Sequence, residues 1–191
     1  EYPRPLANNL EAQFKLTELY KAAGDRAQRT YWLQNIVNTH NRAGAEKSDR
    51  STYLAASAQT EISQTSYDDF NRIALTLPLK ASLQRKRAAM ESAIKGQEQI
   101  LAYGVSEFTT DASFKIGEIY AQLSRDLMNS QRPKDLDELA LEQYAILLEE
   151  QAYPFEEKAI EIHQANSQRS WKGTYDGGVK RSFETLAKML P

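Results

Sequence analysis

The segment Ala12-Gln-Phe-Lys-Leu-Thr-Glu-Leu-Tyr20 recurs one hundred residues later as Ala112-Ser-Phe-Lys-Ile-Gly-Glu-Ile-Tyr120. Five of the nine positions are identical, and two more exchange leucine for isoleucine. Apolar residues spaced by one and two helical turns form a single stripe on a helix. The small residue inside each copy, Thr17 or Gly117, leaves room for a second helix to approach. The repeat therefore predicts two equivalent helices, each packed closely against a partner helix.

A helical period continues along the rest of the chain, and no alternating strand pattern interrupts it. Ser48 and Asp111 are expected N-caps, Gly24-Asp25 is an expected turn, and Pro78 and Pro154 are expected to end or kink helices. The expected helices lie at about 9–23, 31–41, 48–62, 67–77, 79–102, 111–127, 136–152, 155–169 and 176–189. The predicted fold class is all-α, with eight or nine helices joined mostly by short connections as antiparallel hairpins.

The repeated segment resembles the first helix of the tetratricopeptide repeat, which reads Ala-x-x-x-Leu-Gly-x-x-Tyr and is often followed by Gly-Asp. The first copy matches better because Gly24-Asp25 follows it, although Arg29 stands where the family prefers alanine. The resemblance implies an α-solenoid of helix hairpins, and the spacing of one hundred residues is close to three repeats of ~34 residues. We expect an N-terminal extension at 1–8 and one domain at 9–191, with units at 9–44, 48–77, 79–104 and 111–170 and a partial unit at 174–191.

A second, narrower resemblance lies in the segment Leu147-Leu-Glu-Glu-Gln-Ala-Tyr-Pro-Phe-Glu-Glu-Lys-Ala-Ile-Glu-Ile-His163. It is similar to large tetratricopeptide proteins of Gram-negative envelopes, some of which accompany proton-driven Tol/Exb-type or gliding-motility machinery. This resemblance implies a periplasmic scaffold and further domains of a longer chain. A cytoplasmic location is the alternative.

Composition narrows the classes of function. The chain carries 24 basic and 26 acidic side chains, whereas a dedicated nucleic-acid binder usually has a basic excess. It has no cysteine, which removes thiol catalysis, disulfides and Cys-ligated metals, and its only histidines are His40 and His163. No stretch approaches the roughly 18 apolar residues of a membrane span. We therefore expect a non-enzymatic protein without a cofactor, metal site or membrane insertion.

In a solenoid of helix pairs the first helices line the concave face, where ligands usually bind. The residues expected there are Glu11, Phe14, Glu18 and Lys21 in the first unit and Phe114, Glu118 and Gln122 in the later one. The two phenylalanines are candidate anchors for a partner protein or peptide, and the carboxylates would orient it. The competing interpretation is that both phenylalanines fill the seam between neighbouring repeats.

Two runs of charge have two interpretations each. Glu149, Glu150, Glu156, Glu157 and Glu161 form either a patch for a basic partner or an ordinary solvated helix face. Lys80, Arg85, Lys86 and Arg87 form a basic run that either contacts phosphate or an acidic partner or, as helix pairing suggests, faces water. Gly177-Gly178 follows no strand and is interpreted as flexibility near a helix start.

Two other functions remain open. One is a purely architectural spacer within a larger protein. The other is a helical enzyme or small-ligand domain with a pocket around Tyr144, Tyr153 and His163.

Overall fold

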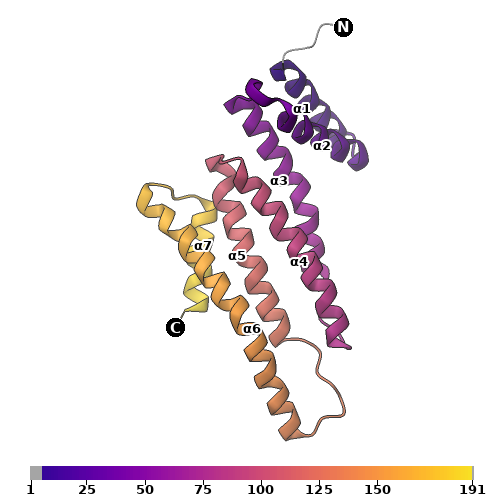
Figure 1. Ribbon diagram of the computed structural model, residues 1–191, viewed down its shortest axis with the longest axis vertical. Helices are drawn as coiled ribbons and strands as arrows, with labels where there is room; N and C mark the ends of the chain where they lie inside the picture. The colour runs from indigo at the N-terminus through magenta and orange to yellow at the C-terminus, as the bar shows by residue number, and fades with distance from the viewer. Residues whose placement is uncertain (1–5, 191) are drawn as a thin grey trace.

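The computed structural model describes residues 6–190 and is built of α-helices (Figure 1). This part of the chain contains no strand, which confirms the all-α class, and it holds seven α-helices where the sequence predicts eight or nine. The α-helices are α1 (Leu6–Ala22), α2 (Arg26–Arg42), α3 (Asp49–Arg72), α4 (Leu79–Ala102), α5 (Ser106–Met128), α6 (Glu138–Ser167) and α7 (Gly177–Met189). Two short 3-10 turns, η1 (Gly44–Glu46) and η2 (Gln168–Lys172), lie between them. None of the described helices is both long and apolar enough to cross a membrane.

Several predicted boundaries are wrong, and the helix expected at 31–41 is α2, which begins at Arg26. The helices expected at 48–62 and 67–77 are one helix, α3, and those expected at 136–152 and 155–169 are one helix, α6, which continues through Pro154. Proline removes one helical N–H, but the carbonyl left without a partner belongs to exposed Glu150, where water can satisfy it. α5 begins at Ser106, so Asp111 lies inside the helix, where it forms ion pairs with Lys115 and Arg181.

Helix starts follow the expected capping chemistry elsewhere. The Asp25 carboxylate accepts a hydrogen bond from the backbone N–H of Gln28, and Ser48 forms a reciprocal capping box with Ser51. Asp176 accepts from the first N–H groups of α7. α1 begins at Leu6, so helix replaces part of the extension expected at 1–8, and residues 1–5 lie outside the described part.

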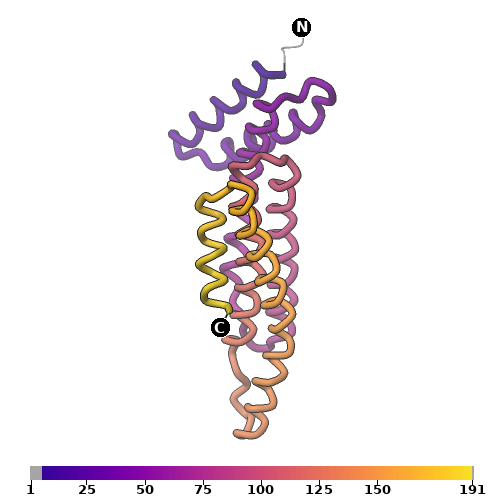
Figure 2. Tube along the Cα trace, turned by 90° about the vertical axis from the view of Figure 1, so that its left-hand side faces the viewer, coloured from indigo at the N-terminus to yellow at the C-terminus, as the bar shows by residue number. Residues whose placement is uncertain are grey.

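The helices form successive antiparallel hairpins, α1–α2, α3–α4 and α5–α6, with α7 packed against the last one (Figure 1). Each helix contacts the next along the chain, and α1, α3, α5 and α7 also contact one another in that order. Figure 2 shows α1 and α2 lying across the end of the longer helices. The two copies of the repeated segment, on α1 and α5, are thus the first helices of the first and third hairpins, so they lie two hairpins apart and not three short repeats apart.

The buried apolar side chains form two clusters, one for each half of the molecule. The first joins α1, α2 and α3 through Leu10, Leu33, Ile36, Val37, Leu54 and Ala58. The second joins α3 to α6 and includes Phe70, Met90, Ile119, Leu123, Leu127 and Ala152. The copy of the repeated segment on α5 therefore faces a core through Ile119, whereas the copy on α1 contributes the half-buried Phe14 to the first cluster and leaves Leu16 and Tyr20 half-buried.

The small residue of the repeat has the predicted role on α5. A β-carbon added to Gly117 would lie 2.6 Å from the ring of His163 on α6, so only glycine allows this approach. The two copies differ in how far they are covered, because Ile119 is 0% exposed and the equivalent Leu19 is 65% exposed. α5 lies between α3 and α7, which cover it on two sides. Within residues 6–190 no helix precedes α1 to cover its outer side in the same way.

Lys86 contradicts the expectation that the basic run faces water. Its side chain is 1% exposed, and its ammonium donates to the backbone carbonyls of Phe70 and Ile73, at 3.2 and 2.7 Å. It also forms an ion pair with Asp126 on α5. Lys86 on α4 therefore caps the C-terminal end of α3 and links α3, α4 and α5.

Candidate functional site

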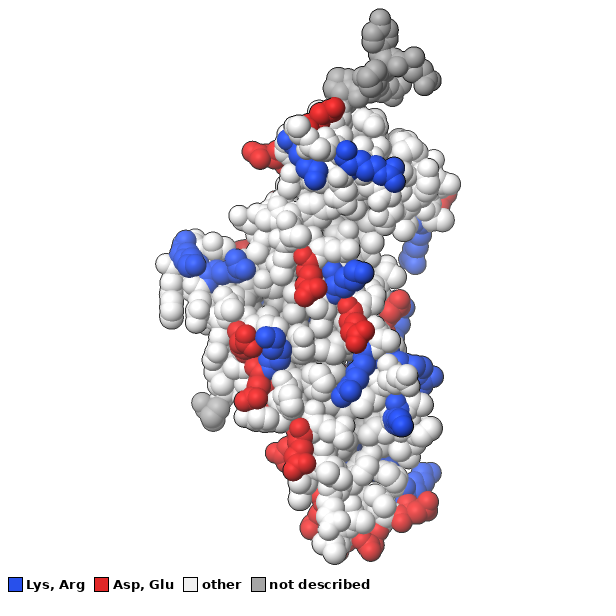
Figure 3. Space-filling view, viewed as in Figure 1, with Lys and Arg blue, Asp and Glu red and all other residues white. Residues whose placement is uncertain are grey.

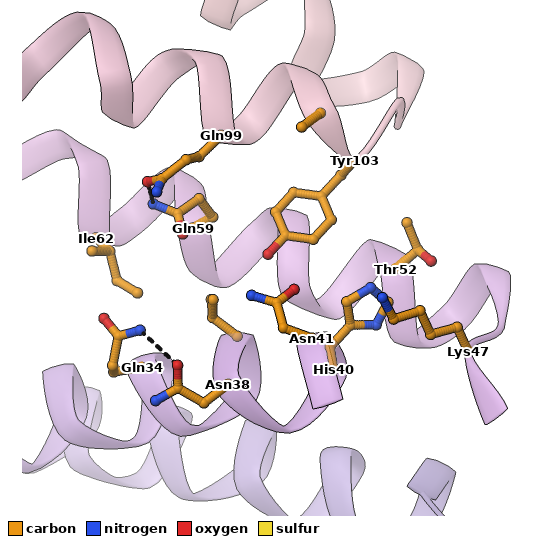
Figure 4. Close-up of a pocket in the computed structure, with 12 residues that line it drawn as sticks. Gln34, Asn38, His40, Asn41, Lys47, Thr52, Gln59, Ile62, Gln99 and Tyr103 are labelled. Carbon is orange, nitrogen blue, oxygen red and sulfur yellow. Dashed lines mark hydrogen bonds between the residues drawn. The ribbon is translucent and has the colours of Figure 1, made fainter. Parts of the chain in front are cut away.

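A polar cleft of about 570 Å³ lies between α2, α3 and the end of α4 (Figure 4). Its floor and edges include apolar Val37, Ile62 and Ala102. Five carboxamide side chains from the three helices converge on it: Gln34, Asn38 and Asn41 from α2, Gln59 from α3, and Gln99 from α4. We call this the amide cleft.

The carboxamides are partly ordered by one another. Gln34 donates to Asn38 at 3.3 Å along α2, and Gln59 donates to Gln99 at 3.1 Å across α3 and α4. In both pairs the acceptor uses its oxygen, so its own NH₂ group stays available. Within the described residues, the NH₂ groups of Asn38 and Gln99 donate no hydrogen bond. The amide cleft thus presents donors that have no protein partner among residues 6–190.

One end of the amide cleft is closed by His40, Tyr103 and Lys47 (Figure 4). His40 is buried, its Nδ1 shares a hydrogen bond of 3.1 Å with the Ser51 hydroxyl, and its ring lies 5.7 Å from that of Tyr103. Burial and the nearby Lys47 ammonium lower the pKa of His40. Burial also raises the pKa of Tyr103, which remains a neutral phenol. Lys47 is therefore the one charged group among the lining residues.

This chemistry suits a ligand rich in amide groups. A carboxamide offers a donor and an acceptor side by side, as the peptide backbone does. Several carboxamides along a cleft can therefore bind an extended chain through its backbone, with little dependence on side-chain sequence. A single ammonium at one end adds a preference for a carboxylate there.

The residues predicted on α1 lie in different surroundings. The carboxylate of Glu11 forms a two-point ion pair with Arg50 on α3, which lowers its pKa. Phe14 is half-buried and packs against the cluster between α1 and α3. Glu18 and Lys21 are exposed.

The residues predicted on α5 lie beside α7, so α3 separates them from the α1 set. Phe114 and Glu118 line a cavity of about 400 Å³ between α5 and α7, together with Arg181 and Thr185. The Arg181 guanidinium lies 4.4 Å from the centre of the Phe114 ring. Gln122 lies one turn further on and donates to Asp126. The two predicted sets therefore do not form one site.

Glu118 belongs to a row of acid, imidazole and hydroxyl groups. Its Oε1 lies 3.6 Å from His163 Nε2, and His163 Nδ1 shares a hydrogen bond of 3.2 Å with Ser182. The neighbouring His163 and the Arg125 guanidinium hold the pKa of Glu118 below its usual range. A nucleophilic hydroxyl must reach a substrate, but Ser182 and His163 are both 0% exposed. This row joins α5, α6 and α7.

The pocket expected for an enzyme around Tyr144, Tyr153 and His163 is not formed. Tyr144 and His163 are separated by 19 residues of one helix, which is about 28 Å. Tyr153 is 56% exposed, whereas His163 is fully buried. Among residues 6–190, no group of three or more His, Asp and Glu side chains is arranged to hold a metal ion.

Comparisons with known proteins return no match, whether with family models, with curated proteins or with solved structures. The fold and the geometry of the surface therefore carry the functional argument.

The amide cleft was not predicted from the sequence, although part of its signal is visible there. Gln34, Asn38 and Asn41 are spaced by four and three residues and so share one face of α2. Nothing in the sequence indicates that this face meets Gln59 and Gln99.

Proposed function

We propose that this protein is a non-enzymatic interaction scaffold of tetratricopeptide-like helix hairpins that binds an extended segment of a partner protein. The observation that carries the proposal is the convergence of five carboxamides from three helices on one open cleft. Paired donors and acceptors match a peptide backbone, and apolar Val37 and Ile62 offer contacts for its side chains.

The order of helix contacts supports the scaffold part of the proposal. In a stack of hairpins the first helix of each hairpin packs against the first helix of the next. The contacts of α1 with α3, α3 with α5 and α5 with α7 follow this order. The long second and third hairpins and the tilted first hairpin depart from short, uniform repeats.

The partner segment lies in the amide cleft and not on the face predicted from the sequence. Two of the predicted carboxylates already have partners within the protein, because Glu11 pairs with Arg50 and Glu118 pairs with Arg125. The carboxamides of Asn38 and Gln99 still have donors to offer. In the envelope of a Gram-negative bacterium, as the narrower resemblance implies, such a scaffold would hold one component of a larger complex.

Selection from a displayed library of random peptides on the whole chain tests this proposal. We expect selected peptides to lose binding to the Asn38→Ala/Asn41→Ala variant and to retain binding to Gln151→Ala/Gln164→Ala, a matched pair of exposed amides on α6. Recovery of no specific peptide would favour the architectural spacer. Peptides that bind the Asn38→Ala/Asn41→Ala variant unchanged would place the binding site elsewhere.

A further inference from the structure

The first half of α6 carries a second apolar stripe on the side away from the core. Leu139, Ile146 and Tyr153 follow one another at intervals of seven residues and are 65%, 56% and 56% exposed. Leu148 and Ala152, which lie half a turn round the helix, are each 2% exposed. This part of α6 is therefore apolar on two opposite faces, and only one of them is covered. We call the uncovered face the outer stripe.

The outer stripe is accessible over several turns. Figures 1 and 2 show the first turns of α6 extending beyond the ends of α4 and α5. Ile146 and Tyr153 line a shallow hollow of about 350 Å³ together with Glu149 and Glu150. Apolar side chains at heptad spacing on an exposed helix are typical of a seam for a second helix.

The charges around the outer stripe have one sign. From Glu138 to Glu157 the helix carries glutamates and no lysine or arginine: Glu138, Glu142, Glu149, Glu150, Glu156 and Glu157. Within the described residues none of these carboxylates forms an ion pair. The nearest basic residue along the helix, Lys158, pairs with Glu161. On the face in Figure 3 both signs of charge are interspersed over the molecule, and acidic side chains lie over the lower part of α6.

We infer that the outer stripe docks an amphipathic helix of a partner protein whose apolar heptad positions are flanked by lysine and arginine. Uncompensated carboxylates beside an apolar seam favour a partner with basic flanks and repel one with acidic flanks. A second copy of this chain would bring the same glutamates together. Anionic membranes and nucleic acids are repelled for the same reason. Leu139 to Tyr153 spans about 21 Å, which matches a partner helix of four turns.

This surface lies on a different hairpin from the amide cleft, so the two binding proposals fail or hold independently. The test uses the whole chain and a fluorescent synthetic helix of about three heptads, with leucine at the seam and lysine beside it. One control peptide replaces lysine with glutamate. A second has the composition of the basic peptide with its leucines scattered. Fluorescence anisotropy at about 0.05 M and 0.3 M salt gives the affinities.

We expect the basic heptad peptide to bind, more weakly at the higher salt, and both control peptides to fail. Ile146→Ser/Tyr153→Ser should lower its affinity about tenfold or more, since two apolar anchors are lost. Leu19→Ser/Tyr31→Ser is the matched control, because these side chains are 65% and 58% exposed on other helices. Glu149→Gln/Glu150→Gln should reduce both the affinity and its salt dependence.

Four results would overturn the inference: equal binding of the basic and acidic peptides, no binding of the basic peptide, an unchanged affinity in the Ile146/Tyr153 variant, or self-association of the chain that this variant abolishes. The last result would assign the outer stripe to a second copy.

Discussion

His163 Nδ1 and Ser182 Oγ share a hydrogen bond of 3.2 Å that joins the third hairpin to α7. The only other histidine has the same arrangement, because His40 Nδ1 lies 3.1 Å from Ser51 Oγ across the step from α2 to α3. In both cases the imidazole lies near the end of a hairpin's second helix and the hydroxyl lies on the next helix. The contact between the first and second hairpins and the contact between the third hairpin and α7 therefore use the same pair of polar groups.

Ser182→Ala should destabilise the fold by about 1–3 kcal/mol, because His163 and Asn166 both lose a buried hydrogen-bond partner. Urea unfolding followed by circular dichroism measures the change. Ser92→Ala, at an exposed position of α4, is the control and should change stability little. Equal stability of Ser182→Ala and wild type would show that this pair does not hold α6 and α7 together.

Two adjacent glycines at the start of α7 should respond differently to alanine. A β-carbon on Gly178 would lie 2.5 Å from the backbone carbonyl carbon of Thr110, whereas one on Gly177 meets open space. Gly178 is thus a site of close helix packing and not the flexible position expected from the sequence. We expect Gly178→Ala to lower the melting temperature, with a cost of about 1–3 kcal/mol, and Gly177→Ala to be neutral. Similar melting temperatures for the two variants would refute this difference.

Lys86→Met should be strongly destabilising although it preserves most of the side-chain volume. It removes the donor to Phe70 and Ile73 and leaves Asp126 without its cation. The expected cost is roughly 3 kcal/mol, at the lower end for a broken buried pair, because Asp126 remains 23% exposed. Denaturant midpoints of this variant and of the exposed neighbour Arg85→Met give the comparison. A loss no larger than that of Arg85→Met would contradict a structural role for Lys86.

Mild acid should weaken the fold through His40. Its pKa is lowered in the folded protein by burial and by Lys47, so the unfolded chain takes up the proton first as the pH falls. This contribution to stability is complete above about pH 6.5 and is lost as the pH falls towards the folded pKa. The carboxylates with lowered pKa, which are Glu11, Asp111, Glu118 and Asp176, act at lower pH.

Urea midpoints at pH 7.5, 6.5 and 5.5 measure this effect. We expect the midpoint of His40→Gln to change less over this range than that of wild type. Parallel pH dependences for the two proteins would show that His40 is not responsible.

The sequence predicted the helices with local signals. Ser48 caps α3 as predicted, and the repeated segment identified Gly117 as a point of close approach. Asp25, which was expected only as part of a turn, is the N-cap of α2. The continuity of α6 was not predicted, because a proline such as Pro154 usually breaks a helix when no tertiary contact supports it. The apolar face of Leu148, Ala152 and Ala159 runs through Pro154 and buries the helix on both sides of it.

The features that the sequence did not reveal depend on contacts between distant segments. Lys86 is buried only because the end of α3 brings two carbonyl groups to it. Gln59 and Gln99 are 40 residues apart and meet only when α3 and α4 form a hairpin. Composition and periodicity carry no information about such contacts between distant segments.

The most direct test of the central claim, binding of a partner segment in the amide cleft, is an NMR titration of the whole ¹⁵N-labelled chain with the strongest peptide from the library selection. We expect the side-chain carboxamide signals of Gln34, Asn38, Asn41, Gln59 and Gln99 to shift together and to saturate at one peptide per chain. If these signals stay in place while those of Gln122 or the amides of α7 move, the amide cleft is not the binding site.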